Sequence, residues 1–431
     1  MPGSLRRVAL YWVRDPQVFR GSLGLKFLHC IHSVDPRGGG PIQFVRQMAE
    51  LGDELGYQLE VASVDDPECE HVCSFPAPVH ALGPARLQYG YSARFVPWLK
   101  ETASSYDLVI VNGLWQYPAL GTWLALRRTK TPYVVFPHGM LDPWFNRAYP
   151  LKHLKKLLYW PWADYRVLKD AQAVLFTSEE ERLLARQSFR PYRCNEVVFG
   201  FGTLPPPGDA GQQVTEFRRR FPAAGERFLL YMGRIHEKKG VDLLLGAFAR
   251  VAVAFPDIVL VVAGPGEREA YGASLREGLL RDHPSASERV LWTGMLSGDL
   301  KWGALRAAEA LVLPSHQENF GLVVSEALSC GTPVLLSDKV NIWREVAAAG
   351  AGLVEPDDRD GTEKLLRNWL DKTAADREAM RARCLECYSR QFNIKEVLTR
   401  MMPVLERCAS PGKGTPGAMK NELSGRPVDI M

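Results

Sequence analysis

Two glutamates eight residues apart, Glu318 and Glu326, give the strongest chemical signal in the sequence. We expect Glu318 in the loop after a buried strand and Glu326 about two turns into the following helix, where position i+8 returns close to the same face. Both carboxylates would then border one crevice and accept hydrogen bonds from sugar hydroxyls. The alternative is a solvated helix face, which the intervening Phe320, Leu322 and Val323 disfavour.

The backbone between the two glutamates is suited to phosphate. Asn319, Phe320, Gly321 and Leu322 lead into the predicted helix. Amide groups at a helix N-terminus are free to bind an anion, and the helix dipole favours negative charge there. The segment therefore predicts a site that holds a diphosphate beside a sugar.

A basic segment follows an earlier predicted strand, Phe228 to Tyr231. It runs from Gly233 to Gly240 and contains Arg234 and Lys239. The arginine fork and the lysine point charge both suit a diphosphate leaving group. Taken alone, however, this segment is more typical of a surface charge cluster.

The first half of the chain supplies two further candidate loops. Gly38-Gly39-Gly40 follows the predicted strand Phe27 to Ile31, and glycine lets backbone amides approach a phosphate; a tight strand-to-helix turn is the alternative. His138 follows another buried strand and is positioned to reach across a crevice between domains, although histidine more often packs than catalyses. No GxGxxG dinucleotide fingerprint accompanies these loops.

Parallel sheets would bring these loops together. Short apolar runs alternate with longer helical patterns from residue 27 to residue 176, and the rhythm restarts from residue 228 to residue 336. This alternation predicts an α/β protein with two Rossmann-like, doubly wound domains. Ligands bind beyond the carboxyl ends of parallel strands, which is where the candidate loops lie.

Composition shifts place the domain boundaries. Glycine and proline are frequent from residue 200, and an amphipathic pattern ends before a tail rich in Pro, Gly, Lys and Ser. The predicted parts are an N-terminal extension (1–24), a first domain (25–199), a linker (200–225), a second domain (226–388), a C-terminal amphipathic helix (389–408) and a disordered tail (409–431).

The overall composition excludes several classes of protein. A net charge of +4 over 431 residues is too small to predict nucleic-acid binding. The eight cysteines are too sparse for a disulfide scaffold and form no paired CxxC motifs, so we expect a reducing cytoplasm and no structural metal site. The apolar run Val8 to Val13 is too short for a secretory signal, and polar residues and glycines interrupt the uncharged run Leu108 to Leu126.

Taken in order, these motifs resemble those of the retaining glycosyltransferases of family 4, the group 1 glycosyltransferases. The resemblance covers on the order of nine-tenths of the chain, and the Glu-x7-Glu pattern at Glu318 and Glu326 is its most diagnostic element. It implies the GT-B fold, in which two Rossmann-like domains face each other across a cleft and a C-terminal helix crosses back. The segment His138 to Trp144 looks like a subgroup from bacterial surface polysaccharide synthesis.

The resemblance also implies roles for the candidate residues. His138 and Glu318 would act at the donor sugar, as the catalytic pair. The implied donor-binding residues are Gly39, Gly40, Arg234, Lys239, Met295, Leu296, Asn319, Phe320, Gly321, Leu322 and Glu326. Within this set, Arg234 and Lys239 would neutralise the diphosphate, Glu326 would hold the ribose, and the backbone at Met295 and Leu296 would meet the base.

Such enzymes move a sugar from a nucleotide-sugar donor with retention and generally need no metal ion or other cofactor. The implied acceptor is a carbohydrate or a lipid-linked oligosaccharide of exopolysaccharide or O-antigen synthesis. Two alternatives stay open, namely a nucleotide-sugar epimerase or hydrolase on the same fold and a non-catalytic nucleotide-sugar-binding scaffold. The chain departs from many relatives at Val198 to Thr203, where they carry a Pro-Asn-Gly segment.

Residues 144–169 interleave basic and aromatic side chains, a composition typical of a bilayer interface. The segment predicts contact with an anionic membrane surface and a peripheral location on the inner face of the plasma membrane. An equally weighted alternative is a helix that packs its aromatic side chains inward and leaves its lysines in solvent.

Overall fold

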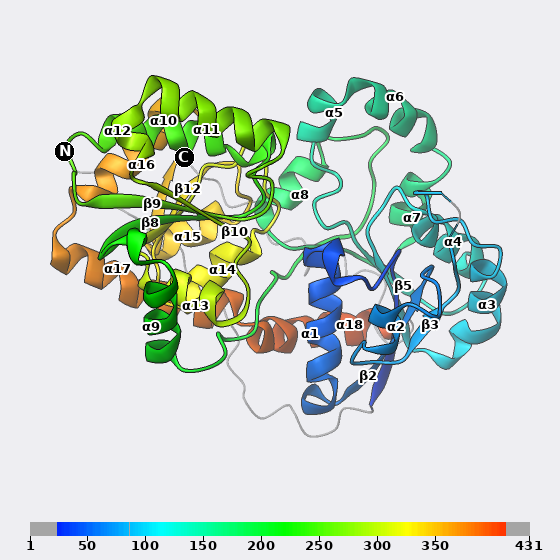
Figure 1. Cartoon of the computed structure of the whole chain (residues 1–431). Coiled ribbons are helices and arrows are strands. Elements are labelled where there is room, and N and C mark those ends of the chain that lie inside the picture. The colour runs from blue at the N-terminus through cyan, green and yellow to red at the C-terminus, as the bar shows by residue number, and fades with distance from the viewer. Residues whose placement is uncertain (1–23, 86, 411–431) are drawn as a thin grey trace, which may run out of the picture.

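The computed structural model describes residues 24–85 and 87–410 of the chain. Within these ranges the chain forms two parallel sheets, which lie in two separate lobes in Figure 1. Residues 1–23 of the predicted extension and residues 411–431 of the predicted disordered tail lie outside the described ranges. The observed architecture is the two-domain α/β arrangement that the sequence predicts.

The first sheet has seven strands in the order β3-β2-β1-β4-β5-β6-β7, all parallel. The strand order reverses between β1 and β4, which opens a crevice at the carboxyl ends of these strands. The strands are β1 (Leu25–Cys30), β2 (Tyr57–Ser63), β3 (Val79–Ala81), β4 (Leu108–Asn112), β5 (Tyr133–Phe136), β6 (Val174–Phe176) and β7 (Glu196–Val198).

The second sheet has six parallel strands in the order β10-β9-β8-β11-β12-β13 and reverses between β8 and β11. Its strands are β8 (Arg227–Met232), β9 (Ile258–Ala263), β10 (Val290–Gly294), β11 (Ala310–Leu313), β12 (Val334–Ser337) and β13 (Gly352–Glu355). Both sheets thus have a topological switch point, where ligands bind in open α/β folds.

Helices cover both sheets. The helices of the first half are α1 (Gly40–Leu55), α2 (Glu70–Cys73), α3 (Phe95–Thr102), α4 (Tyr117–Leu126), α5 (Trp144–Ala148), α6 (Pro150–Tyr159), α7 (Asp164–Asp170) and α8 (Glu179–Ala185). The others are α9 (Ala210–Arg220), α10 (Val241–Val251), α11 (Ala270–Asp282), α12 (Pro284–Ser287), α13 (Gly298–Ala307), α14 (Leu322–Ser329), α15 (Trp343–Ala349), α16 (Arg359–Leu370), α17 (Ala374–Cys387) and α18 (Ile394–Ala409).

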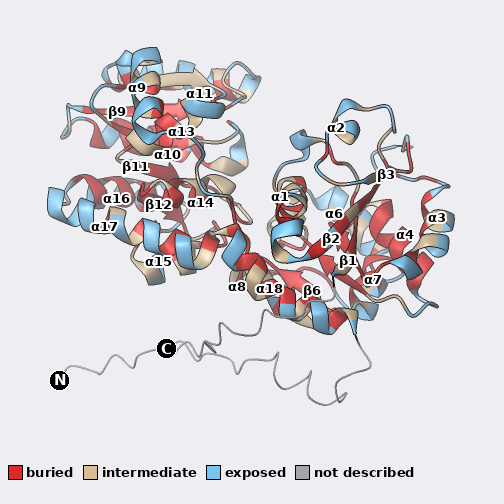
Figure 2. Cartoon of the chain, turned by 90° about the horizontal axis from the view of Figure 1, so that it is seen from below, coloured by how far each residue is buried: buried red, intermediate tan, exposed pale blue. Residues whose placement is uncertain are grey.

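The central strands are buried on both faces, and Figure 2 shows buried residues concentrated in the sheets. Along β4, Leu108 and Ile110 pack into one apolar cluster, while Val109 and Val111 pack into another. Helices α1 and α18 contribute to the first cluster, and helices α3, α4 and α7 contribute to the second. Because successive strand side chains point to opposite faces, a strand covered on both sides must be apolar throughout.

The predicted linker is only partly a linker. Residues 210–220 form helix α9, which packs against α13 of the second domain with Phe217 fully buried. Asp209 caps this helix, since its side chain accepts a hydrogen bond from the amide of Gln212 at 2.8 Å. The predicted linker was wrong from residue 210 onward, because that prediction rested on the preceding glycines and prolines and took no account of Asp209 as a helix cap.

Helix α18 crosses back to the first domain, as Figure 1 shows, and packs against α1, β4 and β5. It starts at Ile394 rather than at residue 389, because a π-helical turn at Tyr388–Phe392 precedes it. Asn393 ends that turn and caps α18 by accepting a hydrogen bond from the amide of Lys395 at 3.0 Å.

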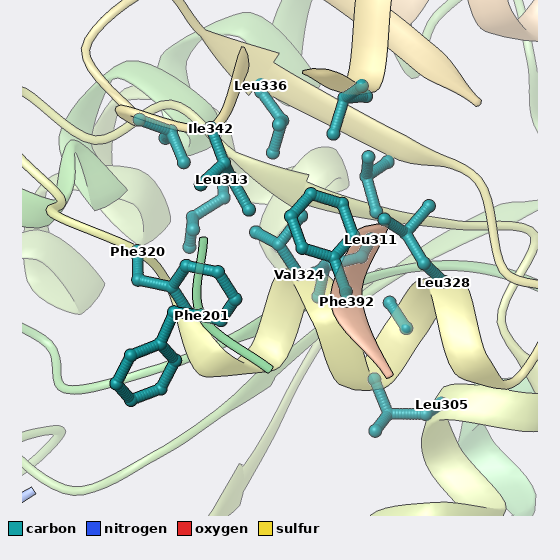
Figure 3. Packing of buried hydrophobic residues seen from close by; sticks show 14 of the residues in the cluster. Phe201, Leu305, Leu311, Leu313, Phe320, Val324, Leu328, Leu336, Ile342 and Phe392 are labelled. Atoms are coloured by element: carbon teal, nitrogen blue, oxygen red, sulfur yellow. The ribbon is translucent and has the colours of Figure 1, made fainter. Parts of the chain in front are cut away.

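Aromatic side chains join the two domains beside the crossing helix. Phe201, in the segment between the sheets, stacks on Phe44 of α1 with ring centroids 4.6 Å apart and lies 4.7 Å from Phe320 of the second domain. Phe320 also meets Phe392, and Figure 3 shows the rings of Phe201, Phe320 and Phe392 beside the core of the second domain. The segment that departs from the Pro-Asn-Gly pattern therefore provides an apolar contact between domains.

Candidate active site

A cavity of about 760 Å³ lies between the two domains. Loops that follow β1, β5 and β6 line it from the first domain, and loops that follow β8, β9, β10 and β11 line it from the second. Twelve of the thirteen predicted residues line this cavity: Gly40, His138, Arg234, Lys239, Met295, Leu296, Glu318, Asn319, Phe320, Gly321, Leu322 and Glu326. Gly39 does not, because the chain turns at this residue into α1 and Gly40 takes the position at the cavity.

The two glutamates each form an ion pair with a lysine from another element. Lys239 donates to Glu318, and Lys301 of α13 donates to Glu326 at 2.6 Å. All four side chains are largely buried at the cavity wall. Each acidic group therefore enters the cavity with a cation beside it, which offsets part of the cost of burying its charge.

Glu326 lies about one turn into α14, not about two, because the helix begins only at Leu322. The preceding Gly321 has φ of 70°, a left-handed conformation that glycine adopts without strain. Glu318 is held by the backbone instead: its amide donates to Lys339 O at 3.0 Å and its carbonyl accepts from Asn341 N at 2.9 Å. The irregular loop, rather than helical spacing, brings both carboxylates to one cavity.

The cavity wall of the second domain is rich in cations. Arg234 is exposed at the mouth, and Lys238 donates to Gln317 Oε1 at 3.1 Å. Burial lowers the pKa of Lys238. Together with Lys239, Lys301 and the N-terminal amides of α14, these groups form a site for an anionic group.

His138 faces this cationic wall from the first domain. It has φ of 51°, an uncommon conformation for a residue other than glycine, and its ring stacks on Phe136. Burial lowers the pKa of His138 to about 3, so the ring is neutral at physiological pH. Strained residues held at a cavity in this way cluster at functional sites.

A buried hydrogen-bond chain sets the tautomer of His138. Asn112 Nδ2 lies 3.3 Å from Ile110 O and 3.1 Å from His29 Nδ1, both of which it reaches as a donor. Its Oδ1 therefore faces His138 Nε2, 3.1 Å away, and accepts the proton of that nitrogen. The remaining ring nitrogen of His138, Nδ1, is left as an acceptor.

Glu181 of α8 fixes the loop that carries His138. Its carboxylate accepts hydrogen bonds from Gly139 N at 2.6 Å and from Thr177 N at 2.7 Å, and Thr177 Oγ1 donates to it at 2.6 Å. Burial raises the pKa of Glu181. The loop is thus held by a buried carboxylate that lies 42 residues after Gly139 in the chain.

Direct contacts between the domains join the two walls of the cavity. Asn319 Nδ2 donates to Thr177 Oγ1 at 3.3 Å, and Gln317 Nε2 donates to Asp142 Oδ2 at 3.1 Å. Gly139 permits this approach, because a Cβ at its position would lie 2.6 Å from Cγ of Asn319. The loop of the first glutamate therefore touches the His138 loop directly.

Several residues of the site were missed in the sequence. Lys301, Gln317 and Thr177 line the cavity, while Asn112 and Glu181 hold the residues that do. Asn112 ends an otherwise apolar strand, a signal that could have identified it. Glu181 lies in a run of three glutamates that is typical of a solvated helix start, so nothing in the sequence marked it as buried.

Within the described ranges, no group of three or more His, Cys, Asp and Glu side chains is arranged to hold a metal ion. All eight cysteines lie in those ranges and are free thiols. None of the described helices has the length and apolar character needed to cross a membrane.

Comparisons with known proteins agree with this architecture. Residues 39–200 match the family model for the glycosyl transferase 4-like domain, and residues 213–384 match the model for glycosyl transferases group 1. A D-inositol 3-phosphate glycosyltransferase of Jonesia denitrificans is 30% identical over 392 residues, covering 85% of this chain and 89% of the relative. A phosphatidyl-myo-inositol mannosyltransferase of Mycobacterium leprae is 30% identical over 403 residues, covering 89% and 96%.

Solved structures share the fold. HepE of Anabaena, solved in complex with UDP-glucose, has a TM-score of 0.69 to this chain at 17% identity. The match covers 89% of this chain and 99% of HepE.

Proposed function

Because the chain belongs to the group 1 glycosyltransferases of family 4, we propose that it is a retaining, metal-independent enzyme that transfers a sugar from a nucleotide-sugar donor. The observation that carries this proposal is that one cavity has Glu318, Glu326 and four cations on one wall and His138 on the other. A polyol that carries a diphosphate matches this distribution of carboxylates, cations and helix N-terminal amides.

The proposed roles follow from the charges at the cavity. Arg234 and Lys239 neutralise the diphosphate, and the amides of Asn319 to Leu322 bind phosphate and sugar. Glu326 binds the ribose, and the backbone at Met295 and Leu296 meets the base. Glu318 and His138 hold the donor sugar, the histidine as the hydrogen-bond acceptor that its tautomer makes it.

Transfer proceeds by front-face attack in this proposal. The bond between the anomeric carbon and the diphosphate oxygen breaks, and its electron pair stays on the leaving diphosphate. The acceptor hydroxyl attacks from the same face, and its proton passes to the leaving oxygen. Fixed cations and amides stabilise the negative charge that develops on the diphosphate, which is the task that a metal ion performs in other transferases.

A ligand screen by thermal shift tests the donor. A ligand that binds only the folded state raises the melting temperature, and we expect one nucleotide sugar among UDP-, GDP- and ADP-sugars to do so, equally in EDTA. Loss of the shift in EDTA would contradict metal independence. Free sugar or an epimer formed without acceptor would favour a hydrolase or epimerase, and binding without turnover on any acceptor would favour a scaffold.

The proposed acceptor is a lipid-linked oligosaccharide, reached from an anionic membrane surface. Helix α6 supports this, because its outer face is apolar: Leu151, Leu154 and Leu158 are 80%, 57% and 71% exposed, and Trp162 beyond the helix is 53% exposed. The opposite face of the helix, with His153, Lys156 and Tyr159, is partly buried. The inward-packing alternative therefore describes one face of α6, and the bilayer hypothesis describes the other. A leucine stripe flanked by Lys152 and Lys155, with no acidic residue from 143 to 163, matches an anionic bilayer.

Flotation with liposomes tests this surface. Replacing Leu151, Leu154 and Leu158 by serine removes apolar contact without disturbing the core, since all three side chains are exposed. We expect the wild type to float with phosphatidylglycerol vesicles and the variant to stay in the pellet fraction. Equal flotation of both proteins, or equal binding to neutral phosphatidylcholine vesicles, would remove the membrane proposal.

A further inference from the structure

A second cavity, of about 630 Å³, lies beside the first one. Trp144 and Tyr149, at the ends of α5, line it from the first domain, and His236, Asp242 and Asp357 are among the residues that line it from the second. Its volume falls within the range of about 300–1,000 Å³ that small-molecule sites have. Of the residues placed above at the anionic site, only Lys238 also lines this cavity.

The two cavities share a wall. Lys238 lines both of them, and its Nζ lies 5.6 Å from the centre of the Phe145 ring. The neighbouring residues of α5 face opposite sides, since Phe145 lines the first cavity and Trp144 lines the second. A ligand longer than one sugar unit that enters the first cavity therefore has the second beside it.

The aromatic residues of the second cavity offer ring faces and edges to a ligand. Trp144 and Tyr149 lie edge to face, with ring centroids 6.2 Å apart and an angle of 77°. Tyr149 is exposed, and no buried packing depends on it. Aromatic faces pack on the C–H faces of sugar rings, which bury apolar area without giving up the hydration of the hydroxyls.

The polar residues supply both donors and acceptors. His236 Nδ1 accepts from Lys238 N at 3.2 Å, which leaves Nε2 as the ring nitrogen that can donate to a ligand. Asp242 accepts from Tyr271 Oη at 3.0 Å through one oxygen only, which leaves its second oxygen as an acceptor. Asp357 pairs with His316 at 2.9 Å, and this hydrogen bond raises the pKa of His316.

Carboxylates outnumber lysines and arginines in the second cavity, whereas the reverse holds in the first. Three carboxylates, from Glu237, Asp242 and Asp357, face Lys238 and the two histidines. A phosphate or carboxylate ligand would meet these carboxylates at close range, which is unfavourable. A neutral ligand with many hydroxyl groups meets only donors and acceptors.

We propose that the second cavity is a subsite for the acceptor glycan, which binds the neutral sugar units that lie beyond the unit being glycosylated. The inference rests on the proposed function, because it takes the acceptor to be a glycan. It assigns Trp144 and Tyr149 as the residues that hold those units. The donor diphosphate and the reacting hydroxyl stay in the first cavity.

Saturation-transfer NMR on the full chain tests the subsite without turnover. The probes are linear gluco-, manno- and galacto-oligosaccharides of one to five units, added in the presence of the nucleotide diphosphate that binds best. We expect oligosaccharides of at least one series, and no monosaccharide, to bind the wild type. Tyr149→Ala and Trp144→Ala should each weaken that binding by about tenfold, because each removes one stacking face.

Trp162→Ala is the matched control, since Trp162 is exposed and lines neither cavity. It should leave oligosaccharide binding unchanged, and all three variants should bind the nucleotide with wild-type affinity. If no oligosaccharide of the panel binds, or if Tyr149→Ala binds as tightly as the wild type, the subsite is overturned. Failure of the wild type to bind any nucleotide in the same samples would instead overturn the proposed function.

Discussion

The two domains build their walls of the active site by different means. In the second domain, the charged residues lie in short recognisable segments of the sequence, and pairs from different segments neutralise one another, as Glu318 does with Lys239, 79 residues away. In the first domain, His138 depends on Asn112 and Glu181. Asn112 lies 26 residues before His138, and Glu181 lies 42 residues after Gly139, the neighbour of His138. Both walls need the folded sheets, but the second domain carries its functional residues in recognisable motifs, whereas the first domain relies on single buried residues outside any motif.

The largest expected effect concerns the wall of the second domain. Glu318→Gln keeps the shape of the side chain but removes its charge and its ion pair with Lys239. We expect turnover to fall by about a hundredfold while donor affinity changes by less than about threefold, because the contact matters most in the transition state. Steady-state kinetics and calorimetry with the donor measure the two quantities.

Glu269→Gln is the control for this substitution, since Glu269 is exposed in the second domain and lines neither cavity. It should leave turnover within about twofold of the wild type. Near-normal turnover of Glu318→Gln would show that another carboxylate holds the donor sugar.

The next effect concerns the wall of the first domain. Glu181→Gln replaces one acceptor oxygen by an NH2 group, which opposes the hydrogens of Gly139 N or Thr177 N. We expect the free energy of unfolding to fall by about 2 kcal/mol and turnover to fall by about tenfold, because the loop that carries His138 loosens. Thermal denaturation and kinetics on the same sample measure both.

Glu180→Gln is the matched control, because its side chain meets Arg344 at the surface rather than the His138 loop. If Glu181→Gln changed stability alone, with normal turnover, the loop would not depend on that carboxylate for its function. Comparison of the two glutamines separates a general effect on α8 from the specific one.

Asn112→Asp probes the tautomer of His138. A carboxylate at hydrogen-bond distance raises a histidine pKa, whereas burial keeps the pKa of His138 at about 3 in the wild type. As the pH falls through the raised pKa, the ring of the variant takes up a proton and Nδ1 is lost as an acceptor. Activity of the variant should therefore fall on the acid side, while the wild type stays flat between about pH 5 and pH 8.

Asn112→Leu completes the test, because it removes the hydrogen bonds without adding a charge. It should lower turnover by about tenfold at every pH and add no acid limb to the profile. Identical pH profiles for the aspartate variant and the wild type would show that His138 does not act through a neutral ring.

The burial of each strand explains which parts of the fold the sequence predicts. Central strands such as β4 are buried on both faces, so they are apolar throughout and stand out as continuous runs. The edge strands β3, β7 and β13 were missed, because they are short and partly exposed and need no such run. Helix α9 was missed because glycines and prolines just before it predict a linker.

For the site, the sequence predicts those functional residues that lie together in one segment directly after a predicted strand. Glu318 and Glu326 were placed at one crevice although the helical geometry behind that prediction was wrong by about a turn. Glu181 could not be found, since its burial follows from the packing of α8 under β6 and not from its neighbours in the chain. Lys301 is equally hidden, because its partner Glu326 is 25 residues away.

The smallest expected effect lies where the two walls meet at the surface. Arg344 of the second domain donates to Glu180 of the first at 2.8 Å, and its side chain is 36% exposed. An ion pair in that environment contributes at most about 1 kcal/mol, so Arg344→Ala should lower the stability by less than that and change KM for the donor by less than about twofold. A double-mutant cycle with Glu180→Gln isolates the pair from other effects of each substitution. A coupling well above that value, or a tenfold rise in KM, would mean that contact between the domains governs the cavity, and the division into two independently built walls would have to be abandoned.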